Sequence, residues 1–156
     1  MKQSYKLSEV REMFVRDTME RKANKSANEP IIKLIDMIDN DNATIECEPN
    51  NSKGALNRGS VVECLIKLLL KKGNSAKKSY NALEADLVIK GVKYEIKYSS
   101  SKGYAHYNPN QDLSNLIFVD KSGVYLTSGK NILLDKCGKH IQTIVFDKNV
   151  KVLVSF

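Results

Sequence analysis

Apolar residues at helical spacing mark the start of the chain. They recur at intervals of three and four residues at Leu7, Val10 and Phe14. This spacing predicts an amphipathic helix, which the polar stretch 20–28 is expected to end. Pro30 then stands where the first residue of a helix would, ahead of an apolar stripe from Ile31 to Ile38. Residues 1–50 are therefore predicted to form a helical N-terminal segment.

The pattern changes in the middle of the chain. Residues 48–59 are rich in turn formers and predict a loop. A third helix is expected to start at Ser60 and to end at Gly73. Its buried face is expected to hold Val62, Leu65, Ile66 and Leu69.

Alternating apolar and polar residues predict strands in the remainder of the chain. Two strands, 86–89 and Val92–Tyr98, are joined by a predicted two-residue turn, Lys90-Gly91. Further strands are expected at four places: 116–120, 123–128, 140–146 and 150–156. Helices followed by a largely antiparallel or mixed sheet predict an α/β or α+β fold, with 1–156 as a single domain.

Composition excludes several classes of protein. The 156 residues are 42% hydrophobic and 28% charged, which is ordinary globular usage. Apolar runs of four residues or fewer are too short for a transmembrane helix, and the polar N-terminus predicts no signal peptide. Three widely spaced cysteines, with no Cys-x-x-Cys and two distant histidines, argue against disulfides and zinc. A soluble cytoplasmic protein without a membrane partner is expected.

Positive charge is concentrated in the later part of the chain. The net charge of +7 divides into −2 over residues 1–50 and +9 over residues 51–156. A basic segment with few acids suggests a polyanionic partner, because neutralised phosphates release counterions. The alternative is that these lysines only solvate a surface.

Three of the eight acids of the basic segment, Glu84, Asp86 and Glu95, fall on or beside the predicted hairpin. With Lys90-Gly91 as its turn, Asp86 lies opposite Glu95, and alternate side chains share a face. The expected core face holds Leu87, Ile89, Val92, Tyr94, Ile96 and Tyr98. The opposite face holds Glu84, Asp86, Val88, Lys93, Glu95 and Lys97.

Asp86 and Glu95 predict a metal site on this charged face. Two carboxylates about 5 Å apart repel each other, and a cation between them explains their placement. Oxygen donors without Cys or His favour Mg²⁺ or Mn²⁺ over zinc. Lys97 would orient a water or stabilise charge on a phosphate. The alternative is a plain solvated face, with Glu84 paired to Lys97 and both carboxylates hydrated.

The order Asp86, then Glu95-Ile96-Lys97 resembles the D…(D/E)-x-K motif of the PD-(D/E)XK superfamily, the restriction-endonuclease-like nucleases. Glu63 stands where this family often has a glutamate on the helix before the hairpin. The resemblance covers roughly residues 58–128, and the chain departs from it at Ala85, where the family has proline. It implies a mixed central sheet flanked by helices.

The same resemblance implies roles for individual residues. Asp86, Glu95 and the Ile96 carbonyl would ligate Mg²⁺, with Mn²⁺ as a substitute, and Lys97 would activate the water. Glu63 would complete the metal shell; alternatively, Ser60 and Glu63 form a capping box with no catalytic part.

Residues that would contact nucleic acid lie around this site. Arg58 begins the predicted third helix, where free amides would receive a phosphate, and Lys93 lies on the charged face. The polar and aromatic loop after Lys97 adds Lys102, Tyr104, His106 and Tyr107, whose alternative is an ordinary surface loop.

These observations predict a metal-dependent endonuclease, most simply of DNA, although RNA is equally compatible with them. The alternative is a non-catalytic nucleic-acid-binding or inhibitory protein, of phage or mobile-element type, that retains the nuclease fold. The stripe from Ile31 to Ile38 would either form a homodimer interface or pack on the sheet.

Overall fold

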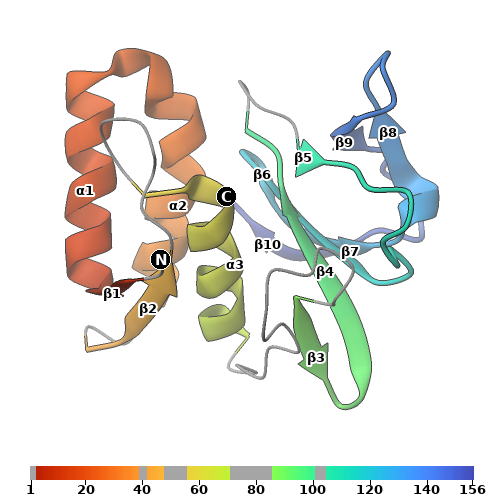
Figure 1. Ribbon diagram of the computed structural model, residues 1–156, viewed down its shortest axis with the longest axis horizontal. Coiled ribbons are helices and arrows are strands. Elements are labelled where there is room, and N and C mark those ends of the chain that lie inside the picture. The colour runs from red at the N-terminus through yellow and green to blue at the C-terminus, as the bar shows by residue number, and fades with distance from the viewer. Residues whose placement is uncertain (1–2, 39–41, 48–55, 71–85, 101–104) are drawn as a thin grey trace. The chain divides into compact units, whose positions relative to one another are not determined.

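The computed structural model describes residues 3–38, 42–47, 56–70, 86–100 and 105–156 (Figure 1). The chain divides into two compact units, Met1–Lys71 and Lys72–Phe156, and each is described by itself. Helices and a largely antiparallel set of strands together confirm the α+β class. A single domain over 1–156 stays a prediction.

Three α-helices make up most of the described part of the first unit: α1 (Leu7–Glu20), α2 (Lys25–Met37) and α3 (Arg58–Leu69). A short 3-10 helix, Lys22–Asn24, joins α1 to α2. Helix α2 packs against both α1 and α3. The residues of its stripe that are buried are Ile31, Leu34 and Ile35. A dimer formed through this stripe would first have to expose these side chains. A homodimer stays a prediction.

The N-terminal segment is not wholly helical, which corrects the prediction for residues 1–50. Strand β1 (Gln3–Lys6) pairs antiparallel with β2 (Thr44–Cys47). Both strands span only four residues, and β1 has no apolar alternation to reveal it. Ile45 and Cys47 are buried and supply the alternation of β2.

Pro30 lies inside α2 rather than at its first residue, because α2 begins at Lys25. A proline there removes one backbone hydrogen bond from the helix. Helix α1 ends at Glu20, as the polar stretch 20–28 predicts, but the last residues of that stretch belong to the start of α2. Asn28 is fully buried, and its amide donates to Asp17 at 2.7 Å.

Helix α3 begins two residues earlier than expected. Asn57 is its N-cap, and the Asn57 side chain accepts a hydrogen bond from the Ser60 amide at 3.0 Å. Ser60 is therefore inside the first turn, and the predicted capping box with Glu63 is wrong. The expected end at Gly73 lies outside the described residues.

A mixed five-stranded sheet forms the centre of the second unit, in the order β10-β7-β6-β4-β3. Its strands are β3 (Leu87–Ile89), β4 (Val92–Tyr98), β6 (Leu116–Asp120), β7 (Gly123–Thr127) and β10 (Lys151–Ser155). Strands β4 and β6 are parallel, and the other neighbours are antiparallel. Five of the six predicted strands are thus confirmed to within a few residues, and the sixth, 140–146, belongs to the second sheet.

A second sheet of three strands covers one face of the first (Figure 1). It contains β5 (Ala105–His106), β9 (His140–Ile144) and β8 (Ile132–Leu134) in that order, and the 3-10 helix Gly129–Asn131 precedes β8. Strands β5 and β8 were not predicted. The core between the sheets consists of Ala105, Leu113, Leu116, Phe118, Tyr125, Ile141 and Ile144.

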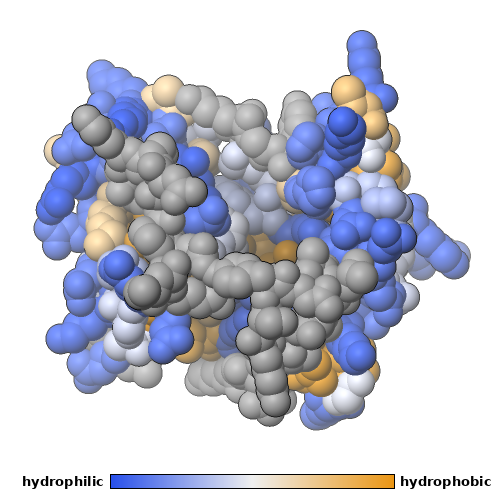
Figure 2. Space-filling view, viewed as in Figure 1, coloured by the Kyte–Doolittle hydropathy of each residue, from blue (hydrophilic) through white to orange (hydrophobic). Residues whose placement is uncertain are grey.

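The outer surface is mostly hydrophilic where Figure 2 shows described residues. Large apolar side chains are exposed at scattered positions, such as Met19 and Phe146. Within the described part of the chain, no helix combines the length and apolarity needed to cross a membrane.

Candidate active site on the β3–β4 hairpin

The predicted hairpin register is confirmed. Lys90 and Gly91 have φ values of 49° and 79°, the left-handed conformation that a tight two-residue turn requires. The pairs that follow from the turn are Ile89 with Val92, Val88 with Lys93 and Leu87 with Tyr94. Strand β3 begins at Leu87, so the direct opposition of Asp86 and Glu95 is the next step of this register and stays a prediction.

Asp86 is tied to the partner strand through its side chain. Its Oδ2 atom accepts a hydrogen bond from the Ile96 backbone amide at 2.9 Å. Asp86 is 5% exposed, and Glu95, the neighbour of Ile96 along β4, is 3% exposed. The hairpin therefore holds two buried carboxylates at the same end, and they are not hydrated on an open face as the alternative supposed.

The face of β4 that holds its charged residues also packs against a core. The prediction of one core face and one charged outer face is therefore wrong. Strand β4 lies between β3 and β6, and Glu95 and Lys97 pair with Leu116 and Phe118. Paired residues of neighbouring strands share a face, so Glu95 and Lys97 adjoin the core between the two sheets. The opposite face is buried as well at Leu87 and Ile96. A central strand is covered on both faces, and alternation alone does not reveal this.

The expected core face is less buried than predicted near the turn. Val92 is 40% exposed, and Ile89, Tyr94 and Tyr98 are half-buried. Among the described strands β3 pairs only with β4, and the tip of the hairpin at residues 90–93 is open to solvent.

Glu63 pairs with a lysine on its own helix. Lys67 Nζ lies 2.9 Å from Glu63 Oε1, and both side chains are largely buried. Glu63 belongs to the first unit and the hairpin to the second. Its share in a metal shell therefore stays a prediction.

Arg58 is held inside the first unit. Its Nε atom donates to Asn28 Oδ1 at 2.8 Å, and its Nη2 atom lies 3.8 Å from Asp17 Oδ2. The guanidinium thus already has protein partners. A phosphate at this helix start would compete with them.

The other predicted nucleic-acid contacts differ in exposure. Lys93 is exposed on the hairpin, and His106 is exposed on β5. Tyr107 is half-buried and packs against the core between the sheets. Lys102 and Tyr104 lie outside the described residues.

A buried polar network in the first unit was not predicted. Asp17 accepts hydrogen bonds from Arg21, Asn24 and Asn28 at 2.8, 3.0 and 2.7 Å. Burial alone would raise the pKa of Asp17, but the bonds from Asn28, Asn24 and Arg21 outweigh it and lower this pKa overall. The network joins all three helices through Arg58.

His140 also has a specific partner. Its Nδ1 atom lies 2.9 Å from Asp135 Oδ2, and this hydrogen bond is the main reason for the lowered pKa of Asp135. The ring of His106 contacts that of His140 edge to face, with centroids 6.0 Å apart. The strand pairing of β5 with β9 creates this contact, and the sequence gives no sign of it.

The hairpin offers the type of ligand atom, oxygen, that a hard cation prefers. Asp86 and Glu95 provide carboxylate oxygens, and the Ile96 carbonyl belongs to the same strand, which matches the oxygen preference of Mg²⁺. Across the ranges that the structure describes, no group of three or more His, Cys, Asp or Glu side chains is placed to hold a metal. Water and substrate oxygens would have to complete the coordination.

No family model matches the chain, and searches of curated proteins and of solved structures find no match.

Proposed function

We propose that this protein is a metal-dependent endonuclease that hydrolyses phosphodiester bonds in DNA. The observation that supports this most is the buried carboxylate pair, Asp86 and Glu95, with Asp86 held by the Ile96 amide. Burying two like charges in one place costs stability, and a bound cation reduces that cost.

In this proposal each hairpin residue has its own role in the reaction. Asp86, Glu95 and the Ile96 carbonyl hold Mg²⁺ or Mn²⁺. When bound, the ion supplies Lewis-acid stabilisation of the phosphate and lowers the pKa of a water. Lys97 shares the face of Glu95 and positions the attacking water or balances charge on the phosphate.

The fold and charge are compatible with this assignment. The resemblance implies a mixed central sheet, and β4 lies inside a mixed sheet, between β3 and β6. The net charge of +9 over residues 51–156 favours a polyanionic substrate. We further propose a cytoplasmic location, because the odd number of cysteines suits a reducing compartment.

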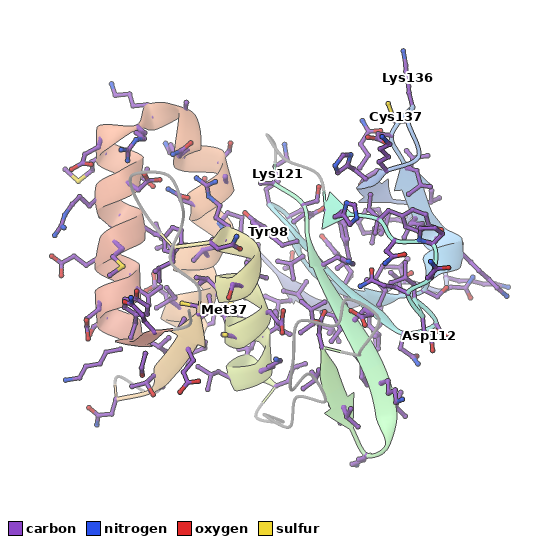
Figure 3. The ribbon with its side chains drawn as sticks, viewed as in Figure 1. Met37, Tyr98, Asp112, Lys121, Lys136 and Cys137 are labelled. Atoms are coloured by element: carbon purple, nitrogen blue, oxygen red, sulfur yellow. The ribbon has the colours of Figure 1, made fainter. Side chains whose placement is uncertain are left out.

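The test is a cleavage assay of the full chain on plasmid and branched DNA, with Mg²⁺, Mn²⁺ or EDTA. Wild type is compared with Glu95→Ala and Lys97→Ala, while salt-dependent DNA binding is measured in parallel. Lys121→Ala is the matched lysine control, because Lys121 lies exposed in the β6–β7 turn (Figure 3). Glu12→Ala serves as the carboxylate control on an exposed face of α1.

We expect metal-dependent cleavage that both hairpin variants lose while DNA binding persists. Cleavage by Glu95→Ala and Lys97→Ala at the wild-type rate would contradict the proposal. Salt-sensitive DNA binding without cleavage of any substrate would favour the non-catalytic DNA-binding protein instead. RNA substrates in the same assay show whether the protein cleaves DNA, RNA or both.

A further inference from the structure

A cavity of about 860 Å³ opens within the second unit. It is formed by the loop before β6, the end of β7, the 3-10 helix before β8, and the start of β10. Gly129 makes the close packing of its wall possible, since its amide donates to the Leu113 carbonyl at 2.7 Å and a Cβ there would press on Leu113. This volume is typical of small-ligand sites.

The lining combines positive charge with neutral hydrogen-bonding groups. Two lysines, Lys130 and Lys151, and two asparagines, Asn115 and Asn149, are among the residues that line it. No carboxylate is among the described residues that line it. Tyr107 and Ile132 supply apolar surface. Such a lining complements an anion that carries a flat ring with polar edges.

Thr127 adds an independent sign of a ligand. Thr127 lines the cavity and is only 6% exposed, and its Oγ1 atom has no hydrogen-bond partner within the described residues. Leaving a buried hydroxyl unsatisfied costs free energy. A residue of this kind in the wall of a polar cavity indicates a hydrogen-bonding capacity that a bound molecule would use.

One residue of the cavity wall, Thr127, lies in the same row of the sheet as Glu95. Thr127 pairs with Leu116, and Leu116 pairs with Glu95, so the three residues lie in one row across the sheet and on one face. Two strand spacings, about 10 Å, separate the backbones of Thr127 and Glu95. Asn115 accepts the Glu95 amide hydrogen bond at 3.0 Å and also lines the cavity.

We propose that this cavity binds a nucleoside monophosphate group, either as a free nucleotide or as one nucleotide of a strand. Lys130 and Lys151 meet the phosphate, and the amides and Thr127 meet the polar edge of the base. The role of the cavity in holding a substrate strand rests on the proposed nuclease function, whereas the binding of a free mononucleotide does not.

Titration calorimetry of the full chain tests the proposal. The probes are the four deoxynucleoside monophosphates, the matching nucleosides, inorganic phosphate, and a short 5′-phosphorylated oligonucleotide. We expect saturable binding of at least one mononucleotide, stronger than that of its nucleoside or of phosphate. A stronger oligonucleotide signal assigns the site to a strand, and an equal one assigns it to the free nucleotide.

Variants separate binding from folding. Lys130→Gln with Lys151→Gln should weaken mononucleotide binding about tenfold or more, and Lys121→Gln should leave it unchanged. Thr127→Val should weaken binding without lowering the melting temperature, because valine has the same shape and removes an unsatisfied hydroxyl. Thr127→Ser retains the hydroxyl and should bind nearly as wild type.

The outcomes distinguish this proposal from the proposed function. Absence of saturable mononucleotide binding, or wild-type binding by both the lysine and valine variants, would overturn the cavity assignment. If inorganic phosphate binds as strongly as the mononucleotide, the cavity does not recognise the nucleoside. Saturable mononucleotide binding by the wild type, without cleavage of any nucleic acid, would reject the nuclease and retain the cavity.

Discussion

The Asp86 carboxylate reaches across the hairpin and accepts the Ile96 amide hydrogen bond at 2.9 Å, one residue before strand β3 begins. A side chain thus takes the place of a backbone acceptor beside Glu95. This hydrogen bond fixes the orientation of the carboxylate. The Oδ1 atom then points away from the Ile96 amide. Function and local structure can therefore be separated by changing the charge alone.

Asp86→Asn should abolish metal-dependent cleavage and leave the fold nearly as stable as wild type. The asparagine oxygen still accepts the Ile96 amide, but the charge that attracts the metal is gone. Asp86→Ala should additionally lower the free energy of unfolding by about 1–2 kcal/mol, because the buried amide loses its acceptor. Cleavage assays and denaturant unfolding measure the two effects. Wild-type cleavage by Asp86→Asn would contradict the metal-ligand role.

Asp17→Ala should destabilise the helical unit strongly. It removes the acceptor shared by Arg21, Asn24 and Asn28, and leaves the buried Asn28 donor and two half-buried donors without it. We expect a loss of about 3 kcal/mol in the free energy of unfolding. Glu12→Ala, which removes an exposed ion pair on the same helix, should change it by less than about 1 kcal/mol. Similar effects of the two substitutions would show that the network contributes little.

The same carboxylate should give the helical unit a dependence on acidic pH. Hydrogen bonds lower the folded-state pKa of Asp17, so its stabilisation is present above the unfolded pKa and is lost as pH falls through the folded pKa. The stability difference between wild type and Asp17→Asn should therefore be constant above about pH 5 and shrink below about pH 4. Helical circular dichroism followed during denaturation at several pH values measures it. A difference that grows on acidification would contradict this sign.

The hairpin was predictable because its information is local. A two-residue turn at Lys90-Gly91 determines which residues pair, and the observed register agrees. The burial of Glu95 was not predictable, since it depends on the parallel pairing of β4 with β6. No local pattern reveals which strand will lie beside another in a sheet.

Polar residues caused the errors in the helical unit. Asn28 resembles a helix breaker when only its neighbours are considered, because asparagine competes for backbone hydrogen bonds. In the structure its side chain bonds Asp17 and Arg58, which are distant in sequence, and the helix continues through it. The cavity at Thr127 escaped prediction for the same reason, since its lining residues come from segments that only the sheet pairing brings together.

Gly123→Ala should destabilise the second unit. A Cβ at Gly123 would collide with the Val154 backbone carbonyl of β10, and backbone has little freedom to move aside. We expect a loss of about 2 kcal/mol in the free energy of unfolding. Gly59→Ala is the control, since a Cβ there meets only Asn57 Oδ1 at 3.5 Å, and alanine should be neutral or stabilising in this helix. Equal melting temperatures for the two variants would argue against the close approach of β10.

Lys90→Asn should raise the stability of the second unit while the proposed site is unchanged. Lys90 adopts φ 49°, a left-handed conformation that asparagine tolerates better than lysine, and Asn-Gly is the preferred pair for this turn. We expect a gain of about 0.5 kcal/mol. Gly91→Ala is a control expected to change stability in the opposite direction. A Cβ there meets no atom within 4 Å, so a loss of about 1 kcal/mol in the free energy of unfolding would come from the φ of 79° and not from a clash. Thermal unfolding measures both changes. A destabilising Lys90→Asn would mean that the lysine side chain has a role in the turn beyond its backbone conformation.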